Sequence, residues 1–357
     1  MAGQRFYALD ALRGLAIALM ILVNTPGSWQ HVYTPLLHAP WNGFTFADIV
    51  FPGFLFVVGA AMFYALRQQQ LSTQTLIKIA RRSALLVLIG VALNIFPFTT
   101  DPAYWRFPGV LQRIGLCYGI AAVLVLMLPQ VRVLWLALVL LLLYWLILLT
   151  GSEQPYSLQH NAVRLIDLLV FGTNHLYQGF GIAFDPEGLL STLPAVSSVL
   201  LGYYAATELA KRSAVSGALW LLKSGAAMVV AALILGQFWP VNKALWSGSY
   251  VLLSTGLLLW LLAGLVYLAD IKAKKALIAP LVIYGTNPLF IYILAWLWAV
   301  LLALIPFGDS NLYQQLFAAL ALMMPAKLAS LCFALIHVLL FWWLSRVLYR
   351  RNIIIRL

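Results

Sequence analysis

The sequence has 357 residues, of which 64% are hydrophobic and only 9% are charged, and its formal net charge is +12. Soluble domains carry about 45–50% apolar and about 25% charged residues, so this composition excludes a water-soluble fold. It also excludes a disordered chain, which needs low hydrophobicity, and a disulfide scaffold, because there are only two cysteines.

Ten apolar runs approach the length of a membrane-spanning helix, which needs about 20 mostly apolar residues. Their apolar residues are continuous rather than alternating, which favours helices over barrel strands. We therefore predict an all-α polytopic membrane protein with about ten transmembrane helices, forming a single domain over residues 1–357. In chain order the predicted spans are 9–24, 46–66, 83–98, 108–128, 133–149, 189–209, 219–238, 250–268, 281–305 and 329–348. Two further apolar segments, 161–171 and 312–324, are too short to span and are expected at the interface or as a re-entrant turn.

The distribution of charge predicts the orientation of these spans. With the N-terminus in the cytoplasm, 17 of the 22 lysines and arginines lie on the cytoplasmic side, and seven of the ten acidic residues lie outside. This is the positive-inside rule, and it accounts for the basic charge without a nucleic-acid partner. Both termini should be cytoplasmic. The five outer cations are Arg106, Arg113, Arg164, Lys243 and Lys327.

The richest polar stretch joins the first two predicted spans and reads LVNTPGSWQHVYTPLLHAPWNGFTFADIVFPGFLF. It contains neither lysine nor arginine, and by the charge count it faces outward. His38 follows two leucines, and an imidazole can accept a proton near neutral pH. Asp48, ten residues later, is the candidate to orient that ring. A loop histidine that only bonds to backbone stays open as the alternative at this point.

Polar side chains near other span ends are weaker candidates. LDALRG pairs Asp10 with Arg13, which an i, i+3 ion pair explains as well as a phosphate contact does. FDPEGLL puts Asp185 and Glu187 at a helix start, where negative charge is favourable by itself. The motifs GVLQRIG, NKALWSGSY and YGTNPLF contribute Gln112, Arg113, Lys243 and Asn287.

Six of these stretches together resemble one family, the heparan-α-glucosaminide N-acetyltransferases, which comprise a lysosomal transmembrane enzyme and its bacterial relatives. In chain order they are LDALRGLAIALMILVN, LLHAPWNGFTFADIVFPGFLFVVG, GVLQRIG, FDPEGLLST, NKALWSGSY and YGTNP. HAPWNGFTFADIVFP is the most specific block, whereas LDALRG also occurs in other membrane acyltransferases. The chain looks like a short bacterial form related to amino-sugar use, which implies a multi-pass protein of the bacterial inner membrane.

The resemblance implies an acetyl-CoA-dependent acetyltransferase. In this family an acetyl group passes from cytoplasmic acetyl-CoA, a donor co-substrate, to the amine of a glucosamine or glucosamine-ended saccharide across the membrane. His38 matches the family's active-site histidine and Asn24 the asparagine beside it, and we add Asp48 as the orienting acid. Residues expected at the donor are Arg13, Arg82, Gln112, Arg113 and Asn287. Residues expected at the acceptor are Trp41, Asn42, Asp185, Glu187 and Lys243.

Two other functions stay open on the sequence alone. An amino-sugar transporter would suit a broken helix such as the one expected at Asn287–Pro288. An acyltransferase that modifies an envelope glycan is a closer alternative. The expected partners are an amino-sugar acceptor and membrane lipid, and the family makes a homodimer plausible. No metal site is predicted, because Pro35 interrupts the helix that His31 and His38 would need to share.

Overall fold

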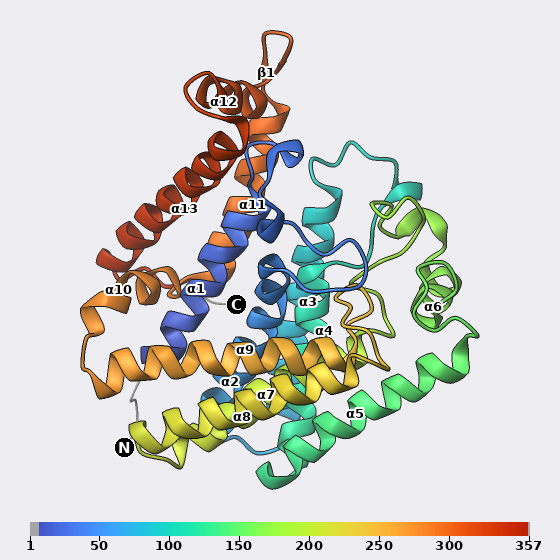
Figure 1. The fold of residues 1–357 in the computed structure, drawn as a ribbon, viewed down its shortest axis with the longest axis vertical. Helices are drawn as coiled ribbons and strands as arrows, with labels where there is room; N and C mark the ends of the chain where they lie inside the picture. Colours follow the sequence, from blue (N-terminus) through green and yellow to red (C-terminus); the bar gives the residue numbers. More distant parts are fainter. Residues whose placement is uncertain (1–6, 356–357) are drawn as a thin grey trace. The chain divides into compact units, whose positions relative to one another are not determined.

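The computed structural model describes residues 7–355, so Arg5 and Arg356, two of the predicted cytoplasmic cations, lie outside the described residues. Within that range the regular secondary structure is almost all helical, with one two-stranded antiparallel hairpin (Figure 1). The α-helices are α1 (Tyr7–Asn24), α2 (Val50–Leu66), α3 (Thr73–Ile95), α4 (Val110–Met127), α5 (Gln130–Gly151), α6 (Ala162–Phe171), α7 (Thr192–Ala210), α8 (Ala214–Leu235), α9 (Gly248–Val266), α10 (Lys275–Tyr284), α11 (Pro288–Leu304), α12 (Leu312–Ala321) and α13 (Ala326–Arg350). The strands are β1 (Pro306–Phe307) and β2 (Ser310–Asn311), and the short helical turns are η1 (Trp29–His31), η2 (Thr34–Leu36), η3 (Phe46–Ile49), η4 (Pro102–Tyr104), η5 (Thr173–His175) and η6 (Tyr267–Ile271).

The prediction of an all-α polytopic membrane protein is confirmed. Seven described helices are long and apolar enough to cross a membrane, or eight if α10 and α11, bent by 62°, form one broken span. The two other predicted runs lie in α3 and α7. The first half of α3 carries Lys78, Arg81 and Arg82, and α7 is interrupted by serines, threonines and a glutamate, so neither is apolar over a full span. The count by length and composition is therefore seven or eight rather than ten.

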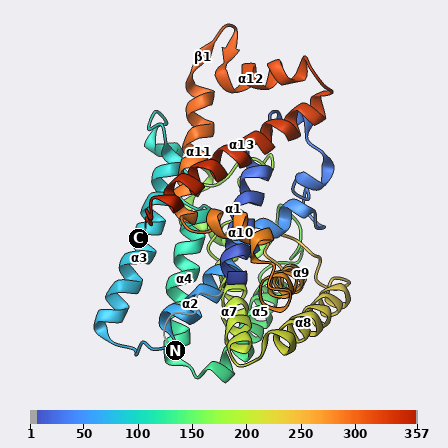
Figure 2. The same ribbon diagram turned by 90° about the vertical axis from the view of Figure 1, so that its left-hand side faces the viewer.

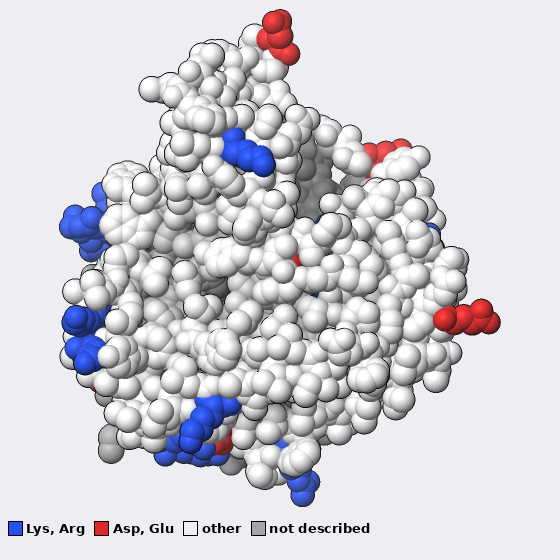
Figure 3. All heavy atoms as spheres, viewed as in Figure 1, with Lys and Arg blue, Asp and Glu red and all other residues white. Residues whose placement is uncertain are grey.

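The surface is sparsely charged. On the face shown in Figure 3, lysine, arginine and acidic side chains form small separate groups, and most of the surface belongs to other residues. Exposed leucines and valines are frequent along α5 and α8. Lipid rather than water is the solvent that such helix faces require.

The described chain forms two compact units, and the first is built around α1. This unit 1 comprises residues 7–38, 45–51 and 264–355. Helix α1 packs against α10 and α13, and α12 packs on α13 (Figure 2). The α1–α10 approach is very close: a Cβ atom on Gly14 would lie 1.7 Å from the carbonyl oxygen of Leu281. Small residues allow such backbone contact, which is how helices associate in membranes.

The second unit surrounds the buried helix α7. This unit 2 comprises residues 39–44 and 52–263. Helix α7 packs against α4, α5 and α8, while α3 pairs with α4. Nearly every residue of α7 is buried, including its serines and threonines, which find partners such as the Ala137 carbonyl for Ser197. The chain enters unit 2 at Ala39, returns to unit 1 at Thr45, and thus divides the HAPWNGFTFAD motif between the units.

Candidate active site

Two of the predicted catalytic residues meet in unit 1. The Nδ1 atom of His38 lies 2.8 Å from Oδ1 of Asp48. The Asp48 side chain is completely buried, whereas the His38 side chain is 44% exposed. A buried carboxylate therefore holds one edge of an imidazole that is itself partly exposed.

The carboxylate also selects the tautomer of the ring. An ionised carboxylate can only accept hydrogen bonds, so the Nδ1 atom of His38 carries the hydrogen that bonds to Asp48. In a neutral imidazole the other nitrogen, Nε2, then keeps its lone pair. A histidine oriented in this way by an acid can remove a proton or attack an electrophile. The predicted role of Asp48 as the orienting acid has the geometry that it requires.

The local sequence explains why Asp48 is placed there. Thr45 is the N-cap of η3, and Asp48 stands three residues later, in the spacing of a capping box. The Thr45 N–H donates to Asp48 Oδ2 at 2.9 Å, and the helical chain continues directly into α2. A carboxylate at a helix start is further stabilised by the helix dipole. Asp48 thus caps a helix through one oxygen and binds His38 through the other.

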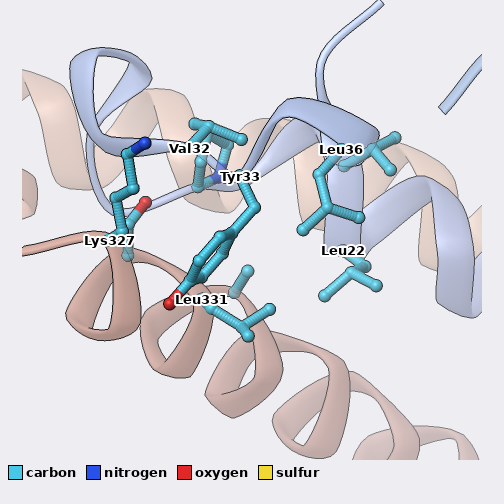
Figure 4. A pocket seen from close by; sticks show the side chains of 10 residues that line it. Leu22, Val32, Tyr33, Leu36, Lys327 and Leu331 are labelled. Atoms are coloured by element: carbon cyan, nitrogen blue, oxygen red, sulfur yellow. The ribbon is translucent and has the colours of Figure 1, made fainter. Parts of the chain in front are cut away.

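Asn24 is the last residue of α1, and its side chain is exposed. The residues beside it border a small, mainly apolar groove between α1, the segment after it and α13 (Figure 4). In Figure 4, Tyr33 extends toward Leu331 on α13, and Lys327 lies on the same helix. Leu36 lines the same groove from the segment after α1, and it precedes His38 by two residues. Asn24 and His38 therefore belong to segments that border one groove of unit 1.

Trp41 and Asn42, predicted at the acceptor, lie in unit 2 and make internal contacts there. The Trp41 indole N–H donates to the Tyr156 carbonyl at 2.8 Å, and its ring meets Phe184 edge-on at 5.2 Å. The Asn42 side-chain oxygen accepts from Asn242 at 3.0 Å, while the rest of Asn42 is exposed. Trp41 is thus an aromatic anchor of its segment, and Asn42 keeps an accessible face.

Asp185 and Glu187 are brought together by Arg106. Two parallel hydrogen bonds of 2.8 Å join the Arg106 guanidinium to Asp185, and a third of 2.6 Å reaches Glu187. Asp185 also accepts from the backbone N–H groups of Tyr177 and Glu187. Burial by itself would lower the pKa of Arg106, but its bonds with Asp185 and the charge of Glu187 raise that pKa above its usual value. Both carboxylates are thus already neutralised by an arginine.

Arg113 is buried beside the same turn. Its side chain is 1% exposed and donates to the carbonyl of Gly188 at 2.8 Å and to the Ser191 hydroxyl. Its guanidinium lies 5.3 Å from the centre of the Trp246 ring, in cation–π contact. Asp167 lies against the turn as well: its carboxylate occupies the space that a Cβ on Gly188 would need. Arg113 and Asp167 together fix the turn that leads into α7.

The remaining residues predicted to bind the acetyl-CoA donor are divided between the two units. In unit 1, Arg13 donates to Asp10 at 2.7 Å and to the Gly285 carbonyl at 2.6 Å, and the Asn287 amide binds the backbone of Ile353 and Ile355.

In unit 2, Gln112 is buried and donates to the Phe107 carbonyl, whereas Arg82 is exposed and its guanidinium lies 4.7 Å from the centre of the Tyr118 ring. Lys243, predicted at the acceptor, is half-buried in the turn before α9. Of these residues, Arg82 is the one that presents an exposed cation.

Sequence reasoning missed Thr45 and Arg106. The Thr-x-x-Asp pattern ahead of an apolar run was a local signal for Thr45. Arg106 had no such signal, because its partner Asp185 is 79 residues away. No cluster of three or more histidine, cysteine or acidic side chains suited to a metal ion occurs within residues 7–355.

Comparisons with known proteins agree on one family. A family model described as heparan-alpha-glucosaminide N-acetyltransferase, catalytic, matches residues 5–238. The heparan-alpha-glucosaminide N-acetyltransferase of Mus musculus is 30% identical over 82% of this chain and 53% of its own length. That of Homo sapiens is 30% identical over 81% of this chain and 52% of its own. The chain spans about half the length of these curated relatives. The match to the family model includes His38 and Asp48 but not Lys243 or Asn287.

Proposed function

The chain belongs to the heparan-α-glucosaminide N-acetyltransferase family, and on that premise we propose that it is a transmembrane N-acetyltransferase. In this proposal the acetyl group of cytoplasmic acetyl-CoA passes to the amine of glucosamine, or of a glucosamine-ended saccharide, on the periplasmic side of a bacterial inner membrane. The observation that carries the proposal is the His38–Asp48 pair, in which a buried acid orients an accessible imidazole.

The proposed chemistry uses this pair as a general base. An amine must be neutral to attack a thioester, and a base within hydrogen-bond reach contributes about 10²–10⁴ in rate. His38 Nε2 takes the proton of the amine as nitrogen bonds to the thioester carbonyl carbon. The carbon–sulfur bond then breaks, the CoA thiolate leaves with the electron pair, and the imidazolium of His38 returns its proton to that thiolate. Asp48 stabilises the imidazolium that forms in between.

A second route uses the same atoms in a different order. His38 Nε2 attacks the thioester first, CoA leaves, and the acetyl-imidazole then passes its acetyl group to the amine. In both routes an oxyanion forms at the carbonyl, and the exposed amide of Asn24 is the proposed donor to it. Recovery of an acetylated His38 peptide from enzyme quenched without acceptor would select the second route.

The structure favours some of the expected substrate contacts over others. Asp185 and Glu187 would have to exchange Arg106 for the ammonium group of a sugar, which is costly for carboxylates this deeply buried. The exposed side of Asn42 needs no such exchange. On the donor side, we propose that Arg82, an exposed cation, contacts the phosphates of CoA.

Sealed liposomes with the purified protein test the function. Radiolabelled acetyl-CoA is supplied on the face that carries the chain termini, glucosamine is enclosed on the other, and protein-free liposomes are the control. We expect labelled N-acetylglucosamine in the glucosamine compartment. Glucosamine that crosses without being acetylated would instead establish the transporter alternative, and label on a different glycan would establish the envelope acyltransferase.

A further inference from the structure

We propose that Thr45 is a positioning residue for His38, acting through both the Asp48 carboxylate and the backbone that carries His38. This inference rests on the proposed function for its catalytic meaning. Thr45 is not among the residues that the sequence motifs indicated, and its role follows from hydrogen bonds within unit 1.

Thr45 touches the histidine–acid pair from two directions. Its hydroxyl lies 2.6 Å from the carbonyl oxygen of Leu37, the residue directly before His38. The same hydroxyl lies 3.1 Å from Oδ2 of Asp48, and the Thr45 N–H donates to that oxygen at 2.9 Å. Oδ2 is the oxygen that does not face His38, because Oδ1 makes the contact with the ring. One side chain therefore bridges the two chain segments that supply the pair.

Proton counting shows what the hydroxyl does. A threonine hydroxyl has a single hydrogen, and a carbonyl oxygen can only accept it. The short contact therefore means that Thr45 donates to Leu37 and fixes the chain at the entry to His38. The backbone N–H of Thr45 holds Asp48, and this bond survives any substitution that keeps the backbone in place. The hydroxyl oxygen also accepts from the backbone N–H of Asp48, as in a capping box. Loss of the hydroxyl should therefore disturb the alignment of His38 with Asp48, while the bond from the Thr45 N–H to the carboxylate remains.

This arrangement separates the effects of two substitutions. Thr45→Val removes the hydroxyl and keeps the branched shape, whereas Thr45→Ser keeps the hydroxyl and removes one methyl. If Thr45 only filled space, Thr45→Ser would be the more harmful substitution and Thr45→Val the milder one. Thr34→Val is the matched control, because Thr34 is an exposed threonine in the same unit.

The first test does not depend on activity. Diethyl pyrocarbonate transfers an ethoxycarbonyl group to a neutral imidazole nitrogen, with loss of ethanol and carbon dioxide, and peptide mass spectrometry gives the rate at each histidine. We expect Thr45→Val to slow the modification of His38 about three- to tenfold, the range for one lost hydrogen bond. In Thr45→Ser and Thr34→Val, the reagent should modify His38 at the wild-type rate. The exposed His160 should react at the same rate in all variants.

The second test uses acetyl transfer. Thr45→Val should lower kcat by a similar factor of about three to ten, with KM for acetyl-CoA changed by less than about twofold, and Thr45→Ser should restore kcat. The inference is overturned if Thr45→Val labels His38 like the wild type, or if Thr45→Ser is impaired as much as Thr45→Val. A wild-type protein without acetyl transfer would contradict the proposed function. The rates of His38 modification would still decide whether Thr45 positions His38.

Discussion

His38 directs one ring nitrogen at the completely buried carboxylate of Asp48, 2.8 Å away, while almost half of its own side chain stays exposed. This pairing makes Asp48 the determinant of the histidine tautomer. In Asp48→Asn, the amide NH₂ can donate to Nδ1, which moves the ring hydrogen to Nε2 and blocks proton acceptance. We expect kcat to fall by about 10²–10⁴-fold with the fold retained. Steady-state kinetics with a thermal melt as the control would check this, and a kcat within twofold of the wild type would contradict it.

We expect substitution of Arg106 to lower the stability of the folded protein. Arg106→Gln leaves Asp185 and Glu187 buried next to each other without their cation, which should cost about 2–4 kcal/mol. Arg106→Lys should recover part of the loss, because a lysine keeps the charge but not the parallel pair of bonds. The measurement is Tm in detergent micelles. Arg132→Gln, at an exposed arginine, is the matched control and should leave Tm unchanged.

Gly14 should tolerate no larger residue. A methyl group there would meet the Leu281 carbonyl oxygen at 1.7 Å, so Gly14→Ala must push α1 and α10 apart. We expect a loss of several degrees in Tm and a lower yield of folded protein. Gly264→Ala is the control, because its Cβ would meet no atom within 4 Å. Equal Tm values for the two variants would show that the close helix approach is not required.

Asp167 should make stability depend on pH. Burial raises its pKa to about 7, against an opposing hydrogen bond from the Leu189 N–H and the attraction of Arg113. Since the folded protein then binds this proton more tightly than the unfolded chain, the contribution of Asp167 to stability is present at low pH. It is lost as pH rises from about 4 through about 7. Asp167→Asn, which stays neutral, should therefore raise Tm relative to the wild type at pH 8 and much less at pH 5.

Glu153→Gln is the control for this measurement, because Glu153 is exposed. It should shift Tm equally at both pH values. A Tm difference between Asp167→Asn and the wild type that is the same at pH 5 and pH 8 would contradict the predicted protonation of Asp167.

The sequence predicted what depends on local pattern. Each of the ten apolar runs overlaps a helix, because uninterrupted apolar residues leave the chain few other structures in lipid. The run predicted at 83–98 covers the apolar second half of α3, whereas the first half of that helix carries three cations. The break between α10 and α11 was predictable from Pro288, which cannot donate a helical hydrogen bond.

The site was predictable only in part. His38 and Asp48 stand ten residues apart on one polar segment, so their pairing was a reasonable expectation. The salt bridge between Arg106 and Asp185 depends on two loops that are distant in sequence, and composition cannot indicate which cation meets which acid. For the same reason Asp185 and Glu187 looked available for an ammonium group, whereas the fold supplies them with an arginine.

The most direct test of the account compares two histidines in one assay. His38→Ala and His31→Ala are reconstituted in sealed liposomes, and transfer of label from acetyl-CoA to glucosamine is measured beside the wild type. His31 lies in the same segment between α1 and α2 and belongs to no proposed step, so its loss should leave the rate unchanged. We predict that His38→Ala lowers the rate by at least about 10²-fold. Wild-type transfer by a folded His38→Ala protein would contradict the central claim that the His38–Asp48 pair carries the reaction.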